Sequence, residues 1–376
     1  MIDDGKHTIF LTLAGSHAHG TARRSSDVDL RGVCIAPMHV RVSYRHEFEQ
    51  FEGTLDGPLW QTVEERLQAH STARFGLDHK VETVIYDVAK FVKLCAAGNP
   101  NTLEILFASE ADWVYDAPLW GMIHKERHSF LSRKVQQTYL GYGMAQLKRI
   151  RTHRSWLLDP PKRKPTRSDY GLPESGTISR DDMNRIEAGI AERLRAWDIE
   201  ELEMPKATRI ALRERLHQFW TDTLGTTEGQ LSDSLLQSAA QSLQLSPETI
   251  AALTAEKRYR AALKHWHSYQ AWKEQRNPGR AALESKHGYD TKHAMHLVRL
   301  MRTGLEVLET ADLRVRRPDA AELLAILDGS CSYDELVAEA DRLQGRMNEA
   351  AKTTTLPADV DHEALDRLLL TLIETH

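Results

Sequence analysis

The sequence predicts an α/β domain over residues 1–115, followed by a mainly α-helical region over residues 116–376. The first part contains four short runs that are apolar or alternate polar and apolar residues, as strands do, at residues 8–14, 27–35, 46–51 and 81–86. From about residue 118 onward, nearly every segment places apolar residues three or four positions apart, which is typical of helices. The two patterns predict a small catalytic-type domain joined to a larger helical region.

The other elements follow from start and stop signals. Asp87 is suited to the N-cap of a helix over residues 88–97, which Gly98-Asn99-Pro100 ends, and a second helix covers 101–108. Residues 53–80 are polar and poorly patterned, so we expect a loop there. Farther on, we expect a loop over 162–176, a variable helical insert over 180–260, and helices over 119–152, 247–276, 290–310, 318–327, 332–351 and 361–374.

Composition excludes several classes of protein. A hydrophobic fraction of 41%, a charged fraction of 27% and a net charge of −5 are ordinary for a globular protein, and they exclude whole-chain disorder and a global basic charge. No apolar run approaches the roughly 20 residues that span a bilayer. The first residues, with Asp3 and Asp4, do not resemble a signal peptide. An odd, widely spaced set of cysteines, Cys34, Cys95 and Cys331, suits free thiols, so we expect a cytoplasmic protein without a membrane partner.

The most informative stretch pairs Gly15-Ser16 with Asp27 and Asp29. Residues i and i+2 of a strand point to one face, so both carboxylates are expected to project together. Like charges this close repel unless they are neutralised, and divalent cations with oxygen ligands neutralise them. Gly15 would let the backbone approach a phosphate, and Ser16 would offer an amide and a hydroxyl at a helix start. These features favour two-metal phosphoryl transfer; the alternative is a solvated strand end.

Gly15-Ser16 followed by the Asp27-Val28-Asp29 strand resembles the signature of the DNA polymerase β nucleotidyltransferase superfamily. Longer motifs at residues 15–21, 26–32, 98–106 and 288–300 are similar to the RNA-ligase-associated (RlaP/YcgL-type) predicted nucleotidyltransferases. The resemblance implies a small mixed sheet with flanking helices, then helices that close the cleft. It also implies transfer of a nucleoside monophosphate from an NTP, ATP among them, to an acceptor hydroxyl with release of pyrophosphate. A functional link to an RNA ligase is expected.

The resemblance also implies roles for single residues. Asp27 and Asp29 would hold two Mg²⁺ (or Mn²⁺) ions, and Glu82 would share one metal and orient the nucleophile. Asp87 is the alternative third carboxylate, although its place at a helix start favours an N-cap. We assign no chemistry to His19. The donor nucleotide would be bound by Gly15, Ser16, Ser26, Lys292 and Arg299.

Lys292, His296 and Arg299 follow i, i+4, i+7 spacing and therefore share one helix face. We expect this cationic face to meet nucleotide phosphates; the alternative is a structural face with buried histidines. His293 and His296 are metal-ligand types, but we identify no nearby cysteine or carboxylate that completes a usual set.

Residues 125–167 carry twelve Lys and Arg against Glu126 and Asp159, with Tyr139, Tyr142 and Trp156 among them. Phosphate contacts combined with stacking are how single-stranded RNA is commonly held. We expect an RNA 3′ end, of a tRNA or a repair substrate, as acceptor, contacted by Lys148, Arg149, Arg151 and Arg154. The alternatives are a solvated helix face, nucleotidylation of a protein or small molecule, and a non-catalytic RNA-binding regulator.

Overall fold

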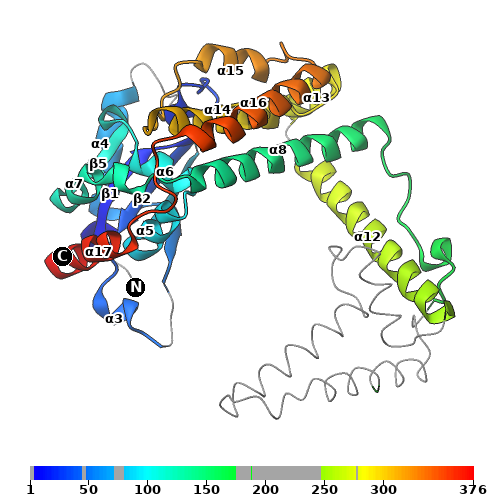
Figure 1. Cartoon of the computed structure of the whole chain (residues 1–376), viewed down its shortest axis with the longest axis horizontal. Helices are drawn as coiled ribbons and strands as arrows, with labels where there is room; N and C mark the ends of the chain where they lie inside the picture. The colour runs from blue at the N-terminus through cyan, green and yellow to red at the C-terminus, as the bar shows by residue number, and fades with distance from the viewer. Residues whose placement is uncertain (1–3, 45–47, 72–79, 175–187, 189–246, 277) are drawn as a thin grey trace. The chain divides into compact units, whose positions relative to one another are not determined.

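The structure is a computed structural model that describes residues 4–44, 48–71, 80–174, 188, 247–276 and 278–376 (Figure 1). Most of the insert expected over 180–260 lies outside these residues. Packing divides the chain into two compact units, one made of residues 1–158 and 279–376 and the other of residues 159–278. The functional boundary at residues 115 and 116 stays a prediction.

The first unit is built on a five-stranded mixed sheet, as expected. Its strands are β1 (Thr8–Leu13), β2 (Val28–Cys34), β3 (Gln50–Gly53), β4 (Val81–Asp87) and β5 (Trp113–Asp116). The spatial order is β3-β4-β2-β1-β5, in which β2 and β4 are parallel and the other neighbours are antiparallel. The two central strands thus begin at the same edge of the sheet, which matters for the site below.

Helices cover both faces of the sheet and extend beyond it. The N-terminal ones are α1 (Asp4–His7), α2 (Gly15–His19), α3 (Met38–Arg41), α4 (Gly57–Ser71), α5 (Val88–Ala96), α6 (Pro100–Leu106), α7 (Pro118–Lys125) and α8 (Lys134–Leu158), with short 3₁₀ turns at Glu110–Asp112 and Arg127–Phe130. The C-terminal ones are α13 (Pro278–His287), α14 (Thr291–Thr310), α15 (Ala320–Leu327), α16 (Tyr333–Thr353) and α17 (His362–Thr375). The expected fold class, an α/β domain followed by a mostly helical region, is confirmed.

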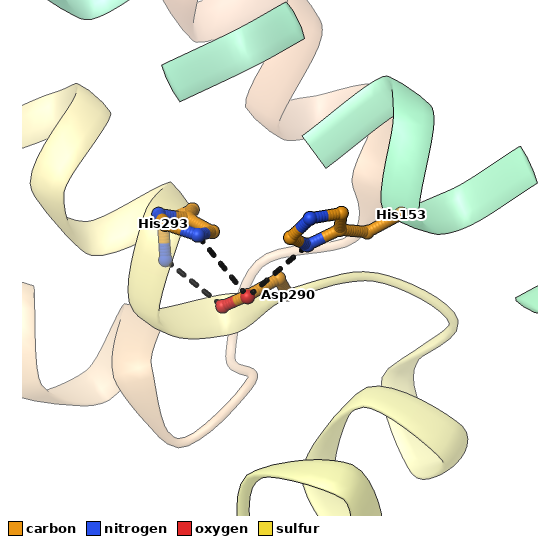
Figure 2. A group of neighbouring side chains, drawn as sticks. All are labelled: His153, Asp290 and His293. Atoms are coloured by element: carbon orange, nitrogen blue, oxygen red, sulfur yellow. Dashed lines mark hydrogen bonds and ion pairs between the residues drawn. The ribbon is translucent and has the colours of Figure 1, made fainter. Parts of the chain in front are cut away.

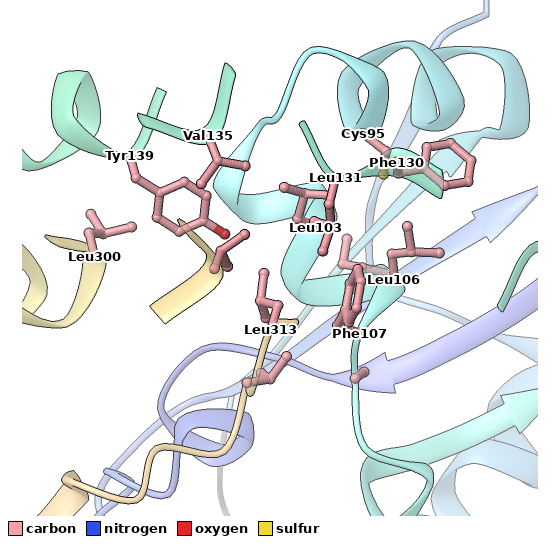
Figure 3. Packing of buried hydrophobic residues seen from close by; sticks show 14 of the residues in the cluster. Cys95, Leu103, Leu106, Phe107, Phe130, Leu131, Val135, Tyr139, Leu300 and Leu313 are labelled. Carbon is pink, nitrogen blue, oxygen red and sulfur yellow. The ribbon is translucent and has the colours of Figure 1, made fainter. Parts of the chain in front are cut away.

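Each face of the sheet has its own core. On one face, Leu11, Leu30 and Ile85 pack with residues of α4. The opposite face continues into a larger core with α5, α6, α8 and α14, where side chains such as Leu103, Val135, Tyr139 and Leu300 meet (Figure 3). The second core joins the C-terminal helices to the sheet.

Helices α8 and α14 pack against each other at glycines (Figure 1). A Cβ at Gly304 would lie 2.6 Å from Cβ of Tyr139, and one at Gly143 would lie 2.9 Å from Cγ of Met301. A larger residue at either position would force the helices apart. This close approach fixes the face of α14 that carries Arg299 relative to the sheet.

The loop expected over residues 53–80 is wrong, because α4 occupies Gly57–Ser71. Leu59, Val63 and Leu67 recur every fourth residue and are buried against the sheet, but polar residues between them hide the pattern. Strand β3 lies later than the expected 46–51, and residues 45–47 are outside the described part. Strand β5 was not expected, and the helix expected over 119–152 is interrupted between α7 and α8.

The second unit contains α12 (Pro247–Gln275) and the 3₁₀ turn Arg167–Tyr170, which an ion pair of 2.9 Å between Arg167 and Glu256 joins. The turn falls within the loop expected over 162–176, and α12 matches the expected helix. Cys34, Cys95 and Cys331 form no disulfide with one another, as expected. Within the described ranges, no helix combines the length and apolar character that a membrane span requires.

Candidate active site

A cavity of about 970 Å³ lies in the first unit. Residues of β1, β2, β4, α2, α6, α8 and α14 line it, so the sheet forms one wall and the helices form the others. Four of the residues to which the sequence assigns site roles line this cavity, namely Gly15, Asp29, Arg149 and Arg299. The chain therefore brings the Gly-Ser turn, the Asp-x-Asp strand and α14 to one space.

Asp29 lies on β2 beside Glu82 of β4. The two residues are register partners on adjacent parallel strands, so their side chains leave the same face of the sheet near the start of both strands. The next pair on this face is Arg31 and Val84, and Arg31 donates a hydrogen bond of 3.2 Å to Oδ1 of Asp29. Sequence reasoning missed Arg31, although its alternation with Asp29 places it on this face.

Glu82 is half exposed and forms an ion pair of 2.6 Å with Lys80. The hydrogen bond and charge of Lys80 lower the pKa of Glu82, so its carboxylate is ionised near neutral pH. Asp27, exposed and one residue before β2, contributes to the raised pKa of Lys80 after Glu82 itself. Glu82 and Asp27 therefore both attract the Lys80 ammonium at the edge of the sheet, and neither carboxylate lines the cavity.

Gly15 permits the close approach of α2 to Asp29. Its φ of +58° is left-handed, and a Cβ at this position would lie 2.5 Å from Oδ2 of Asp29. Ala14, at the N-cap of α2, donates its backbone N–H to the Asp29 carbonyl at 2.8 Å and has no side chain that could cap the helix. Glycine is thus required here for two independent reasons, conformation and space.

Arg299 is buried in the cavity wall and paired with Glu104 of α6. The Glu104 carboxylate also accepts a hydrogen bond of 3.0 Å from Nε2 of His19. Burial opposes ionisation of Glu104, but Arg299 and His19 outweigh it and hold the pKa of this carboxyl well below its usual range. Burial, followed by the charge of Arg299, lowers the pKa of His19. Sequence reasoning gave neither Glu104 nor His19 a role in the site.

The other proposed nucleotide contacts are spread more widely. Burial, reinforced by Arg299 and Lys292, lowers the pKa of His296 to about 3, so this cavity residue is neutral near pH 7. Lys292 itself is exposed and lies outside the lining. Ser16 is half-buried, and the Ser26 hydroxyl accepts a hydrogen bond of 2.9 Å from the Arg23 backbone N–H. Neither residue lines the cavity.

The four basic residues assigned to RNA lie on α8 but in different settings. Lys148, Arg149 and Arg151 are exposed, and Arg149 also lines the cavity. Arg154 instead donates a hydrogen bond of 2.7 Å to the Gly288 carbonyl, and its Cζ lies 4.4 Å from the centroid of the Tyr333 ring. Arg154 therefore has a packing role within the unit.

Asp87 caps α5, as its position indicates. Its Oδ1 accepts a hydrogen bond of 3.0 Å from the Ala89 N–H, and the same carboxylate pairs with Arg41 at 3.1 Å. These contacts commit both oxygens to the local fold.

The expectation that no carboxylate accompanies His293 is wrong. Asp290 lies three residues earlier, and the fold brings His153 of α8 to the same place (Figure 2). Sequence reasoning missed this group because its two histidines are far apart in the chain.

Residues 3–158 match the model of the RlaP family, described as an RNA repair pathway DNA polymerase beta family. No curated protein and no solved structure matches the chain. The matched segment contains the whole sheet and helices α2 to α8, and therefore Gly15, Asp29, Glu82 and the basic face of α8. This description points to a polymerase-beta-like nucleotidyltransferase in an RNA repair pathway. Residues 3–158 of this chain are thus similar to the RlaP family.

Proposed function

We propose that the chain transfers a nucleoside monophosphate from an NTP to an acceptor hydroxyl. The acceptor oxygen forms a bond to the α-phosphorus, the bond from that phosphorus to pyrophosphate breaks, and the hydroxyl proton passes to a carboxylate or to water. The observation that carries this proposal is the in-register pairing of Asp29 and Glu82 on parallel strands beside Gly15. The match to a polymerase-beta-type family supports the same chemistry.

The acidic residues fit divalent metal ions. Asp27, Asp29 and Glu82 offer only oxygen donors, which Mg²⁺ and Mn²⁺ accept. Lys80 and Arg31 already supply positive charge to these carboxylates, which is consistent with a place that favours cations. Two such ions, when bound, neutralise charge on the transferring phosphoryl group and its leaving group. The ionised Glu82 would orient the acceptor hydroxyl.

The donor triphosphate would lie in the cavity, with its phosphates towards Gly15, Ser16 and Arg299. The first-turn N–H groups of α2 have no side-chain cap, and Nε of Arg299 is a buried donor without a hydrogen-bond partner among the described residues. Glu104 neutralises part of the Arg299 charge and fixes the guanidinium in place. Ser26 and Lys292, outside the lining, would contribute only if they approach the bound nucleotide.

We infer that RNA supplies the acceptor. Lys148, Arg149 and Arg151 present three exposed cations along α8. Tyr142, earlier on the same helix, lines the cavity together with Arg149, and its hydroxyl accepts a hydrogen bond of 3.0 Å from the Asn99 side chain. Cations next to an aromatic ring suit a single-stranded 3′ end. The RNA repair description of the family supports this acceptor class. A functional link to an RNA ligase is part of the same proposal and follows from the sequence resemblance alone.

The experiment is transfer of label from each α-labelled NTP with Mg²⁺, with total RNA and total protein offered side by side. We expect nuclease-sensitive label with the wild type and none with an Asp27→Ala/Asp29→Ala double variant. Protease-sensitive label would replace the RNA acceptor by a protein, and label in neither pool, nor in small molecules, would favour a non-catalytic RNA-binding regulator.

A further inference from the structure

A second group of potential metal ligands lies where α8 meets the start of α14 (Figure 2). Nδ1 of His153 is 3.6 Å from Oδ2 of Asp290, and Nε2 of His293 is 3.5 Å from the same oxygen. One ligand atom from each residue lies within 4.8 Å of the other two. Three side chains from two helices and the preceding loop therefore converge on one point.

The two oxygens of Asp290 have different tasks. Oδ1 accepts a hydrogen bond of 3.0 Å from the His293 backbone and so caps α14, while Oδ2 faces both imidazoles. The cap fixes the carboxylate before any ion binds. Asp290 is only 1% exposed, so a metal ion at Oδ2 would offset part of the cost of burying its charge.

We propose that His153, Asp290 and His293 bind one Zn²⁺ ion or a similar divalent transition-metal ion. Zn–ligand bonds of about 2.0–2.1 Å at tetrahedral angles separate ligand atoms by about 3.3 Å, close to the two distances measured here. Small side-chain rotations close the difference. Two imidazole nitrogens with one carboxylate suit Zn²⁺, Co²⁺ or Ni²⁺ better than Mg²⁺, which prefers oxygen ligands.

The site has three protein ligands and room for a fourth. His293 also lines the large cavity, and both histidines are 17% exposed. Water, or an anionic oxygen of a molecule bound in the cavity, would complete the coordination, as at zinc sites that keep an open position. This site uses none of Asp27, Asp29 and Glu82, so it does not rest on the proposed transferase activity.

Metal binding would also join α8 to α14. Any ligand that binds the folded chain and not the unfolded chain raises its stability, so Zn²⁺ should raise the midpoint of thermal unfolding. The alternative is an ion pair between Asp290 and a histidine without a bound metal, for which the unfolding midpoint would not depend on Zn²⁺.

The test is calorimetric titration of the full chain, stripped with a chelator, with ZnCl₂ near pH 7.5, together with visible absorption after addition of CoCl₂. His153→Asn, His293→Gln and Asp290→Asn are the variants. The last keeps an amide oxygen for the helix cap and removes the charge. The matched control is His128→Ala. His128 also pairs with a carboxylate, that of Asp312 at 3.0 Å, but it does not belong to the group formed by His153, Asp290 and His293.

We expect the wild type to bind one Zn²⁺ equivalent that each of the three variants loses or binds at least about 100-fold more weakly. The control should bind as the wild type does, and only chains with the intact site should show the Co²⁺ ligand-field band and a Zn²⁺-dependent rise in unfolding midpoint. The proposal is overturned if the zinc stoichiometry and affinity are the same in all four variants. Variants that lose stability equally with and without Zn²⁺ would show an ion pair instead, and would also overturn it.

Discussion

Gly15 offers the sharpest test of how the turn before α2 serves Asp29. In a Gly15→Ala variant, the added methyl group meets two obstacles. The backbone at this position has φ +58°, which costs a residue with Cβ about 1–2 kcal/mol. The Cβ would also lie 2.5 Å from Oδ2 of Asp29, whereas ordinary contacts begin at 3.4 Å.

The carboxylate must therefore retreat by about 0.9 Å, or the turn must move by as much. A displacement of roughly 1 Å in a reacting or positioning group lowers turnover on the order of 100-fold. We expect Gly15→Ala to lose about 1–2 kcal/mol of stability from backbone strain and about two orders of magnitude in nucleotidyl transfer.

Gly57→Ala is the matched control. Gly57 has a similar φ of +63°, yet nothing lies within 4 Å of an added Cβ. It should lose comparable stability and keep its transfer rate. The assay is Mg²⁺-dependent release of pyrophosphate, with thermal unfolding followed in parallel. Equal activity in both variants, or equal loss in both, would refute the argument that Gly15 makes room for the Asp29 carboxylate.

Three further expectations concern the third carboxylate, pH and RNA. Asp87→Ala should lower the free energy of unfolding by about 1–3 kcal/mol, because the helix cap and the Arg41 pair are lost, but should keep nucleotidyl transfer. Glu82→Gln should lose transfer and keep its stability. A folded Asp87→Ala chain without activity would contradict this. His296 has a pKa of about 3 when folded and 6.5 as a free side chain, so the unfolded chain takes up its proton first and stability should fall from about pH 6.5 towards pH 3. His296→Gln should show a shallower decline in denaturation measured across this range, and an unchanged profile would count against a buried neutral histidine. Neutralising the three exposed α8 cations, Lys148, Arg149 and Arg151, should reduce the salt slope of single-stranded RNA binding by about 2. Filter binding at several salt concentrations measures this slope. Neutralising Lys352 and Arg367 should leave the slope unchanged.

Local signals in the sequence were sufficient for much of the fold. Strands β1, β2 and β4 follow from short apolar or alternating runs, and the Asp87 cap follows from a residue that favours a helix start. Helix α4 shows where such signals fail. Its buried positions, Leu59, Val63 and Leu67, form too narrow a stripe among polar residues to stand out, and burial against the sheet stabilises the helix.

The site depends on long-range pairing, which a single sequence does not encode in a readable way. The motif indicates Asp27 and Asp29, but the partnership of Asp29 with Glu82 requires the parallel register of β2 and β4. Glu104 and Arg299 meet only because α6 and α14 pack into one core. The same applies to His153 and Asp290, whose convergence follows from the close packing of α8 and α14.

Asp29→Asn tests most directly whether Asp29 serves metal-dependent nucleotidyl transfer. The amide is nearly isosteric, so the chain should fold with an unchanged unfolding midpoint. Loss of a ligand charge worth several kcal/mol corresponds to a fall of roughly 100-fold or more in transfer. Measured with an α-labelled NTP, Mg²⁺ and RNA, the variant should transfer almost no label while the wild type does. Wild-type transfer by the folded Asp29→Asn chain would contradict the account.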